Sequence, residues 1–377
     1  MPGAPFKTQT SGELNNPSFS REIDGPNEFL IKIYVPKDRY RFLTFIMSGQ
    51  EDRQIPRRKF IKYGIRIAAA TALAGSTYYL ASRYSTAQHA ERSPAWSTVT
   101  DLPFGIADGT AAVSGNGFLV FGGYGRNVQD YRNSVLEFNG YGWNVKSSMP
   151  TPRWGAAATR YNEYVYVFGG YPNSVAERYE IENDKWNSLA EMPLPLQGQG
   201  LMAATVGSRI FLFFRNLTFE YDPGEDRYTP RANAPLARTW ATCALVRVGD
   251  EDRIYIIGGN DLARGDGTNA NFYYVPSTDS WSRPQPLAPY SAYGVTRDNP
   301  VWMNTIYYGF GHKNPDQFFK DMYAYDPAGA KWSKLPIGCH ERDGVACAIT
   351  AGVLYVVGGR NTPYDQYGLT YCERLIL

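Results

Sequence analysis

Histidine is scarce in this chain of 377 residues, which contains 3 His and 4 Cys. His89 precedes the main body of the sequence, so only His312 and His340 remain within it. Zinc and copper sites that use imidazole usually bring together two or three His side chains. The sequence also lacks a phosphate-cradling glycine loop, a dinucleotide fingerprint and the Ser-His-Asp orders of known hydrolases. We therefore expect no metal site and no cofactor.

The sequence has one uncharged run near its beginning, and that run is short. Residues 67–82 contain sixteen residues without a charge, rich in Ala, Thr and Gly, whereas a span of the hydrocarbon core needs about 20 apolar residues. The basic segment Pro56–Lys62 precedes this run, which is the order of an export leader. Arg57 and Arg58, followed by Phe, Ile and Lys, resemble a twin-arginine signal peptide, with Pro56 where Ser or Thr is usual.

This resemblance implies a bacterial or archaeal source and a periplasmic or secreted protein. An uncleaved leader between Arg66 and Arg83 is the alternative, and it would attach the protein to the membrane. Residues 1–46 show no sustained period, so we expect a disordered extension or an over-called start there. The predicted organisation is thus an extension (1–46), a signal or anchor with its linker (47–93) and one large domain (94–377).

A concentrated basic patch is also missing. The whole chain carries a formal charge of +2, but residues 96–377 hold 24 Lys and Arg against 28 Asp and Glu. Binding to a nucleic-acid backbone depends on clustered Lys and Arg. We therefore expect no nucleic-acid partner.

Glycine and aromatic residues are abundant instead, with 37 Gly, 29 Tyr, 19 Phe and 8 Trp. This composition favours many short strands and tight turns over helices. An apolar run that ends in a Gly pair recurs at residues 118–123, 164–170, 254–259 and 354–359, with weaker copies at 210–215 and 306–311. An aromatic residue marks each cycle, at Trp96, Trp143, Trp186, Tyr228, Trp281 and Trp332. The sequence therefore contains six cycles.

Each cycle is predicted to form four short strands. In the second cycle these are 155–159, with small residues, then 164–168, 176–182 and 186–190. This pattern resembles the kelch repeat, and six copies imply an all-β fold, a six-bladed kelch β-propeller. The last cycle lacks a fourth strand, and Trp96–Val99 has the pattern of that strand. The resemblance therefore implies a ring closed by this N-terminal strand.

Three arginines occupy the start of the inner strand in equivalent cycles, namely Arg153, Arg238 and Arg342. We assign Ala107, Gly198 and Gly294 to the corresponding positions of the other cycles. The arginine position resembles the one with which kelch adaptors of ubiquitin ligases hold acidic peptides, and guanidinium groups suit carboxylates. The alternative is structural, because an arginine of the repeat can also bind neighbouring loops.

The loops that follow the Gly pairs are the second candidate for a ligand site. They are long in four of the six cycles and combine charged with aromatic residues, as sites for polyols and sugars do. The candidates there for ligand contact are Arg126, Asp261, Arg264, His312 and Arg360. Asp108, Asp343 and Asp365 are candidates for an acid or a base, without a distinctive spacing.

Two functional hypotheses remain open. The first is a binding module for a carbohydrate, a sugar acid, an acidic peptide or a periplasmic protein partner. The second is a sugar-modifying enzyme that resembles the bacterial kelch mutarotases of sialic acid. A copper radical oxidase is disfavoured, because its set of two His, two Tyr and a crosslinked Cys cannot be placed.

Overall fold

The computed structural model describes residues 95–125, 132–172, 175–313, 316–338, 340–362 and 368–377. It also describes the backbone of three earlier strands, β1 (Phe19–Ile23), β2 (Glu28–Ile33) and β3 (Leu43–Ser48), which pair in that order. The chain divides into two compact units, Met1–Gln88 and His89–Leu377. The predicted extension, residues 1–46, contains the first two of these strands and most of the third. The predicted leader lies outside the described residues except for the end of β3.

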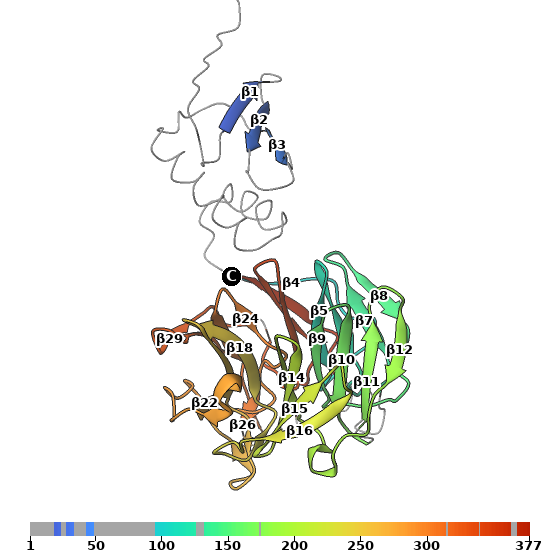
Figure 1. Cartoon of the computed structure of the whole chain (residues 1–377), viewed down its shortest axis with the longest axis vertical. Coiled ribbons are helices and arrows are strands. Elements are labelled where there is room, and N and C mark those ends of the chain that lie inside the picture. Colours follow the sequence, from blue (N-terminus) through green and yellow to red (C-terminus); the bar gives the residue numbers. More distant parts are fainter. Residues whose placement is uncertain are drawn as a thin grey trace, which may run out of the picture. The chain divides into compact units, whose positions relative to one another are not determined.

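The second unit is all-β, and most of its strands belong to four-stranded antiparallel sheets (Figure 1). We number these sheets I to VI. Sheet I contains β5 (Thr110–Ser114), β6 (Gly117–Phe121), β7 (Val135–Phe138) and β8 (Trp143–Lys146). Sheet II contains β9 (Ala157–Tyr161), β10 (Tyr164–Gly169), β11 (Val175–Glu180) and β12 (Lys185–Ser188). Sheet III contains β13 (Met202–Val206), β14 (Arg209–Phe214), β15 (Leu217–Asp222) and β16 (Arg227–Arg231).

The later sheets follow the same order, with short extra strands between them. Sheet IV contains β18 (Thr242–Val248), β19 (Glu251–Ile257), β22 (Asn271–Val275) and β23 (Ser280–Trp281). Sheet V contains β24 (Val301–Trp302), β25 (Thr305–Gly309), β28 (Met322–Asp326) and β29 (Lys331–Lys334). Sheet VI contains β30 (Ala346–Thr350), β31 (Val353–Val357), β32 (Cys372–Ile376) and β4 (Trp96–Thr98). The last sheet therefore joins the two ends of this unit, with Leu375 opposite Trp96.

Residue size explains the order of strands within a sheet. In sheet II, Ala158 on β9 lies opposite Val167 on β10, which lies opposite Glu177 on β11. Small side chains suit the first strand, which is buried on both faces, and the apolar second strand supplies most of the core. Six buried hydrophobic clusters each combine residues of two successive sheets, and one of them joins sheet VI to sheet I.

The recurring aromatic residue of each cycle connects its sheet to the preceding one. The indole Nε1 of Trp186 donates to the carbonyl of Ser147, beyond the last strand of sheet I, at 2.9 Å. The other tryptophans of the repeat do the same toward Thr100, Ala232, Pro286 and Pro336. Tyr228, which replaces the tryptophan of the third cycle, donates its hydroxyl to Ala190 at 3.4 Å. This shared bond explains why the sequence keeps a large aromatic donor at this position.

A ring of backbone hydrogen bonds lies where the first strands begin. One residue from each sheet's first segment donates its N–H to the carbonyl of the residue in the preceding sheet, at 2.8–3.2 Å. All six residues have positive φ, between 54° and 79°. We call this set the axial ring; its members are Asp108, Gly155, Gly200, Trp240, Gly294 and Gly344. Glycine tolerates this conformation, so Asp108 and Trp240 are exceptions that need an explanation.

Candidate functional site

The residue before each member of the axial ring begins the candidate site. We call these residues the rim: Ala107, Trp154, Gln199, Thr239, Tyr293 and Asp343. Isolated antiparallel bridges join Trp154 to Tyr171, Tyr293 to His312 and Asp343 to Arg360. The bridges bring the loops after the second strands beside the rim. The topology therefore gathers side chains from several sheets at one end of the ring.

A charged cluster is centred on Asp343, a rim residue that is 2% exposed. Its Oδ1 accepts a hydrogen bond from Arg360 Nε at 2.9 Å, and its Oδ2 accepts one from Arg360 Nη2 at 3.2 Å. His312 Nδ1 lies against the same Oδ2. Burial alone would raise the pKa of Asp343, but contact with His312 and the charge of Arg360 lower it below its usual value. Asp343 is therefore a carboxylate at neutral pH.

Asp108 is the second carboxyl group of this cluster, and its environment has the opposite effect. Burial raises the pKa of Asp108 above its usual value of 3.8, and the charge of Asp343 adds to the increase. The side chain lies over Gly344, where an added Cβ would be 2.5 Å from Asp108 Oδ1. The neighbouring Tyr124 hydroxyl also has a raised pKa because it is buried. The pKa of Asp108 is thus raised and that of Asp343 is lowered, and two nearby carboxyl groups with different pKa values are suited to acid and base roles.

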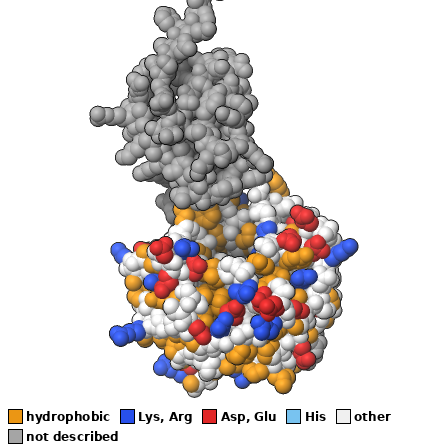
Figure 2. Space-filling model, in the orientation of Figure 1, with side chains coloured by type: hydrophobic (Ala, Val, Ile, Leu, Met, Phe, Trp, Pro, Cys, Tyr) orange, Lys and Arg blue, Asp and Glu red, His pale blue; other side chains and the backbone are white. Residues whose placement is uncertain are grey.

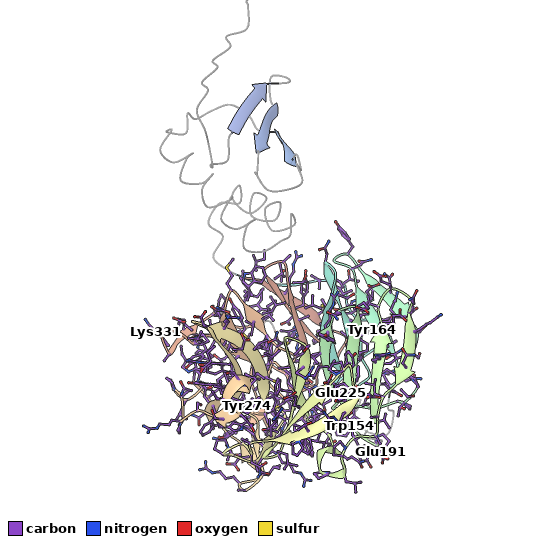
Figure 3. All side chains as sticks on the ribbon, in the orientation of Figure 1. Trp154, Tyr164, Glu191, Glu225, Tyr274 and Lys331 are labelled. Atoms are coloured by element: carbon purple, nitrogen blue, oxygen red, sulfur yellow. The ribbon has the colours of Figure 1, made fainter. Side chains whose placement is uncertain are left out.

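Tryptophans from two sheets form an aromatic surface beside the charged cluster. Trp154 and Trp240 are stacked with ring centroids 6.0 Å apart and an angle of 22°. Trp154 also contacts Tyr124 and Tyr171 edge-on, at 5.4 and 5.9 Å. In the view of Figure 3, Trp154 is labelled on the opposite side of the unit from Lys331. Both indoles are partly exposed, so they are available to a ligand.

The segment Arg297–Asn299 lies behind this surface and crosses from sheet V to other sheets. The Arg297 guanidinium lies 4.9 Å from the Trp240 ring and donates to the carbonyl of Gly109 at 2.8 Å. Asp298 accepts hydrogen bonds from Thr110 Oγ1 at 2.7 Å and from the backbone N–H of Ala111 at 3.1 Å. Asn299 accepts one from the N–H of Leu245 at 2.8 Å. Sheets I, IV and V are therefore linked directly beneath Trp240.

The three arginines of the repeat lie apart from the charged cluster. Arg153, Arg238 and Arg342 are at most 1% exposed. Arg153 pairs with Glu177 and donates to the carbonyl of Val175 at 2.6 Å. Arg238 donates to the carbonyls of Gly258 and Ala270, at 3.1 and 2.8 Å. Arg342 donates to the carbonyl of Val356 and pairs with Glu373.

These contacts favour the structural alternative for the three arginines. Burial lowers the pKa of Arg153 to about 10 and that of Arg238 to about 9, so these charges lie in a poorly hydrated interior. Each guanidinium holds carbonyls near its Gly pair and third strand. A role in ligand contact remains a prediction, but it would require these side chains to leave buried partners.

The loop candidates are divided by the structure. His312 and Arg360 meet at Asp343, as described above. Asp261 is buried on β20 (Asn260–Asp261), which pairs with β17 (Arg238–Thr239), and Arg264 is 77% exposed beside it. Arg126 and Asp365 lie outside the described residues. Of the predicted ligand residues, the structure thus brings His312 and Arg360 together.

Two of the proposed equivalent positions need correction. A backbone hydrogen bond from the Gly pair marks the equivalent position in the next sheet. In sheet I the N–H of Gly123, the second glycine of the pair, donates to the carbonyl of Arg153, and in sheet V the N–H of Gly311 donates to the carbonyl of Arg342. The same bond reaches Gly198 from sheet II, as predicted, but it reaches Ala292 and Ile106 rather than Gly294 and Ala107. Ile106 lies as far before its Gly pair as Arg153 and Arg342 do, so Ala107 was misplaced by one residue, whereas two additional residues separate Ala292 from Phe310 and Gly311. Ala107 belongs to the rim and Gly294 to the axial ring.

Sequence reasoning named Asp108 and Asp343 but missed Trp154, Trp240 and Arg297. A usable signal existed, because Trp154 directly follows Arg153 and Trp240 follows Arg238 by two residues. Arg297 stands where the other first strands have Ala or Cys, including the buried Cys243 and Cys347. Neither signal indicates by itself that these side chains converge.

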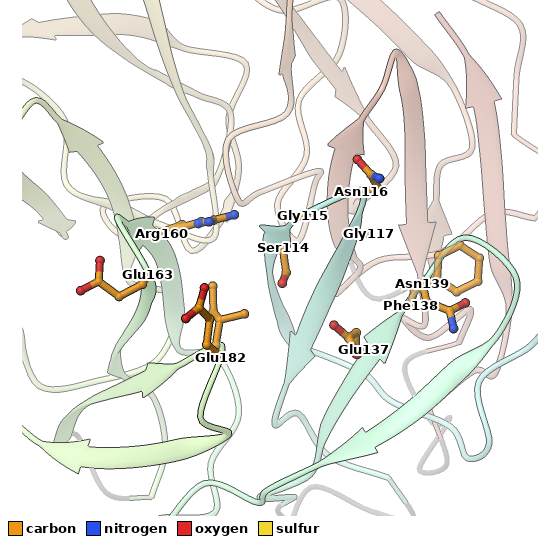
Figure 4. A pocket seen from close by; sticks show the side chains of 11 residues that line it. Ser114, Gly115, Asn116, Gly117, Glu137, Phe138, Asn139, Arg160, Glu163 and Glu182 are labelled. Atoms are coloured by element: carbon orange, nitrogen blue, oxygen red, sulfur yellow. The ribbon is translucent and has the colours of Figure 1, made fainter. Parts of the chain in front are cut away.

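A separate groove lies between sheets I and II at the strand ends away from the axial ring. It has a volume of about 410 Å³ and is lined by Glu137, Glu163, Glu182 and Arg160, among others (Figure 4). The Arg160 guanidinium donates to backbone carbonyls of Asn162 and Val113. Figure 2 shows acidic and basic side chains interspersed on one face of the unit. The convergent chemistry is at the rim rather than in this groove.

The residues that the structure describes contain no cluster of metal ligands. No group of three or more His, Cys, Asp or Glu side chains there is arranged to hold an ion. His312 and Asp343 contribute two such groups, but their neighbour is the cation Arg360. Cys243, Cys347 and Cys372 are buried free thiols.

Comparisons with known proteins agree with the repeat. The family model for the Kelch motif matches residues 152–193, which include Arg153 and all of sheet II. The comparisons support a kelch-repeat family. Kelch-like protein terF from Aspergillus terreus is 26% identical over 250 residues, which is 56% of this chain and 51% of that protein. Kelch-like protein 25 from Xenopus tropicalis is 25% identical over 262 residues, which is 62% of this chain and 41% of that protein.

Other kelch proteins match over shorter lengths. The human Kelch repeat and BTB domain-containing protein 2 is 30% identical over 110 residues, which is 28% of this chain and 17% of that protein. The chain thus spans about half or less of the length of these curated relatives. The solved structure of YjhT has a TM-score of 0.60 at 14% identity and covers 73% of this chain and 96% of its own. That likeness concerns the fold and not the activity.

Proposed function

We propose that this chain is an exported six-bladed kelch propeller that acts as a binding module, with its ligand site at the rim. Six sheets, a cluster between the last and first of them, and the ring of six backbone bonds support the blade number and closure. Export rests on the twin-arginine-like segment Pro56–Lys62. A periplasmic or secreted location follows from that proposal. The partner is a carbohydrate, a sugar acid or acidic peptide, or a protein that presents such a group.

The observation that carries the binding site is the convergence of Asp108, His312, Asp343 and Arg360 beside the stacked indoles. Buried charged groups are costly to maintain unless they are paired, and Asp343 is paired on both carboxylate oxygens. Asp108 also holds a positive φ of 54° where four other ring positions are glycine. Unfavourable backbone angles and buried charges together are characteristic of functional sites. The arginines of the repeat then serve to hold the loops that carry this site.

A sugar-modifying enzyme is the second candidate, because Asp108 and Asp343 differ in proton affinity. Anomer exchange needs one group that gives a proton to the ring oxygen and another that takes a proton from the anomeric hydroxyl. In this role Asp108, whose pKa is raised by burial, supplies the first proton, and the Asp343 carboxylate receives the second. The reverse transfers close the ring on the other face and restore both groups.

The test is ligand-observed NMR on the full chain with a panel of neutral sugars, uronic acids, N-acetylneuraminate and acidic peptides. We expect at least one class to bind wild type, and Asp108→Gly to reduce that binding without loss of folding. Ala330→Gly is the matched control, because Ala330 has a φ of 51° in the turn before β29 and lies away from the rim. Binding that is equal in both variants would contradict the rim site. Accelerated anomer exchange with the same panel would favour the enzyme.

A further inference from the structure

We infer that the rim takes a neutral, hydroxyl-bearing ring, such as a neutral sugar or cyclic polyol, stacked against Trp240 and Trp154. This inference rests on the proposed binding function and specifies its ligand class. It is carried by three observations, which are the backbone at Trp240, the support beneath its indole, and the neutral polar atoms around it.

Trp240 occupies a ring position at which a bulky residue is unfavourable. Its φ is 59°, and four of the other ring residues are glycine. The flanking glycines are required by this indole, since an added Cβ at Gly155 would lie 2.6 Å from Trp240 Cη2 and one at Gly200 would lie 2.7 Å from Nε1. Neighbouring sheets thus leave room for the indole to lie over the ring. A strained residue for which the surroundings make space indicates a functional side chain.

Trp240 is also held rigidly. The guanidinium of Arg297 lies 4.9 Å from the ring, and Arg297 is itself fixed by its hydrogen bond to Gly109 and by burial to 2% exposure. Trp154 stacks beside it at 6.0 Å. The two indoles therefore present a fixed apolar surface of the kind that contacts the CH face of a sugar ring. A pre-formed surface binds with a smaller loss of conformational entropy than a mobile one.

The polar atoms near this surface suit hydroxyl groups. Trp154 Nε1 and Gln199 Oε1 are buried and have no hydrogen-bond partner, and the buried Tyr124 hydroxyl lies beside Arg360. They are two donors and an acceptor without charge, whereas a hydroxyl both donates and accepts. Tyr124 is 1% exposed, so its hydroxyl is shielded from bulk water. Buried polar atoms without partners are costly, and a bound polyol would supply the missing partners.

The cations of the rim do not offer a site for an anion. Both donors of Arg360 that face Asp343 are engaged there, and His312 contacts the same carboxylate. Arg297 retains donors without partners, but it lies beneath Trp240 and is almost fully buried. An anionic ligand would meet Asp343 as a second negative charge. The Arg360 guanidinium is therefore already engaged by Asp343 before any ligand arrives.

The experiment measures saturation-transfer NMR and titrations of the full chain with D-glucose, D-galactose, D-mannose and myo-inositol, beside D-glucuronate and N-acetylneuraminate. We expect a neutral compound to bind more tightly than the acids. Trp240→Gly supplies the residue that the backbone favours and removes the indole. We expect it to fold with a melting temperature no lower than wild type and to weaken binding by at least about tenfold.

Two further variants keep the test decisive. Trp154→Ala should weaken binding in the same direction even if Trp240→Gly does not fold. Tyr141→Gly removes an aromatic residue that is 91% exposed in the turn before β8, and should leave binding unchanged. Tight binding of the acids alone, lost in Asp108→Gly, would overturn the inference but keep the rim site. Binding of no compound would overturn the inference and leave the proposed function to its acidic-peptide test, whereas binding that is unaffected by every rim variant would overturn both.

Discussion

Two layers of side chains lie side by side at the start of the first strands and behave in opposite ways. Arg153, Arg238 and Arg342 occupy the same position in sheets II, IV and VI, are buried, and bind backbone carbonyls within their own sheets. The next position along the chain, the rim, differs from sheet to sheet, and the axial ring after it is glycine in four sheets but Asp108 or Trp240 in the other two. Repetition therefore marks the groups that each sheet needs for itself. Function is better sought where the repeat is broken.

The largest expected effect is in the arginine layer. Arg153→Ala leaves Glu177 buried without its cation, which should cost about 3–5 kcal/mol of unfolding free energy. For a domain of this size, calorimetry should show the melting temperature lowered by roughly 10 °C. The double variant Arg153→Met with Glu177→Met removes both charges and should recover much of the loss. A stable Arg153→Ala protein that has lost only ligand binding would reverse the roles of the two layers.

A smaller loss is expected where a rim-side segment has a structural role. Asp298→Ala removes the acceptors for Thr110 Oγ1 and the Ala111 N–H, and should cost about 2 kcal/mol in chemical denaturation. Asp298→Asn keeps one acceptor oxygen and should lose less. Equal losses in both variants would mean that the two hydrogen bonds are not the source of the effect.

Asp108→Gly should increase the unfolding free energy, because Asp108 holds an unfavourable backbone conformation in the axial ring. Glycine relieves the positive φ, and we expect a gain of about 1 kcal/mol at pH 7. Burial raises the pKa of Asp108 in the folded protein. The contribution of this group to folding stability is therefore fully present below pH 3.8 and is lost as the pH rises through the folded-state pKa. The gain should therefore be larger at pH 7 than at pH 4. Ala330→Gly, also at positive φ, should show no such pH dependence.

The smallest effect is expected for an ion pair outside both layers. Arg227 and Glu225 are 67% and 60% exposed and lie 2.7 Å apart. Glu225→Gln should change the unfolding free energy by less than about 0.5 kcal/mol. A loss of unfolding free energy as large as that of Arg153→Ala would show that burial does not explain why the arginine layer is more sensitive to substitution.

Much of the fold could be predicted because the same sequence pattern recurs in six cycles. The Gly pairs, the small residues of the first strands and the recurring Trp all predicted four-stranded sheets, and the Trp Nε1 bonds give the physical reason for the spacing. Tyr228 shows that even the substituted cycle keeps a donor at this position. The register at the strand starts was less accessible, because the arginine that marks it is present only in sheets II, IV and VI.

The candidate site could be predicted only in part. His312, Arg360, Asp108 and Asp343 were named from loop position and charge, but nothing in the sequence joined them into one cluster. Trp154 and Trp240 were missed, since an indole after an arginine has no distinctive spacing. The sequence left the arginines open as ligand residues or structural ones, and their buried contacts favour the structural alternative.

By itself, the sequence determined the repeating unit, since hydrophobic alternation, glycine conformation and aromatic spacing act over a few residues and are the same in every copy. Only the tertiary structure decided which side chains meet at the rim. Some of those contacts join residues more than 50 positions apart, such as Arg297 with Trp240 and Gly109. They depend on how successive sheets are rotated about the axis and on which backbone carbonyls accept hydrogen bonds from the buried arginines. No local sequence pattern encodes either property.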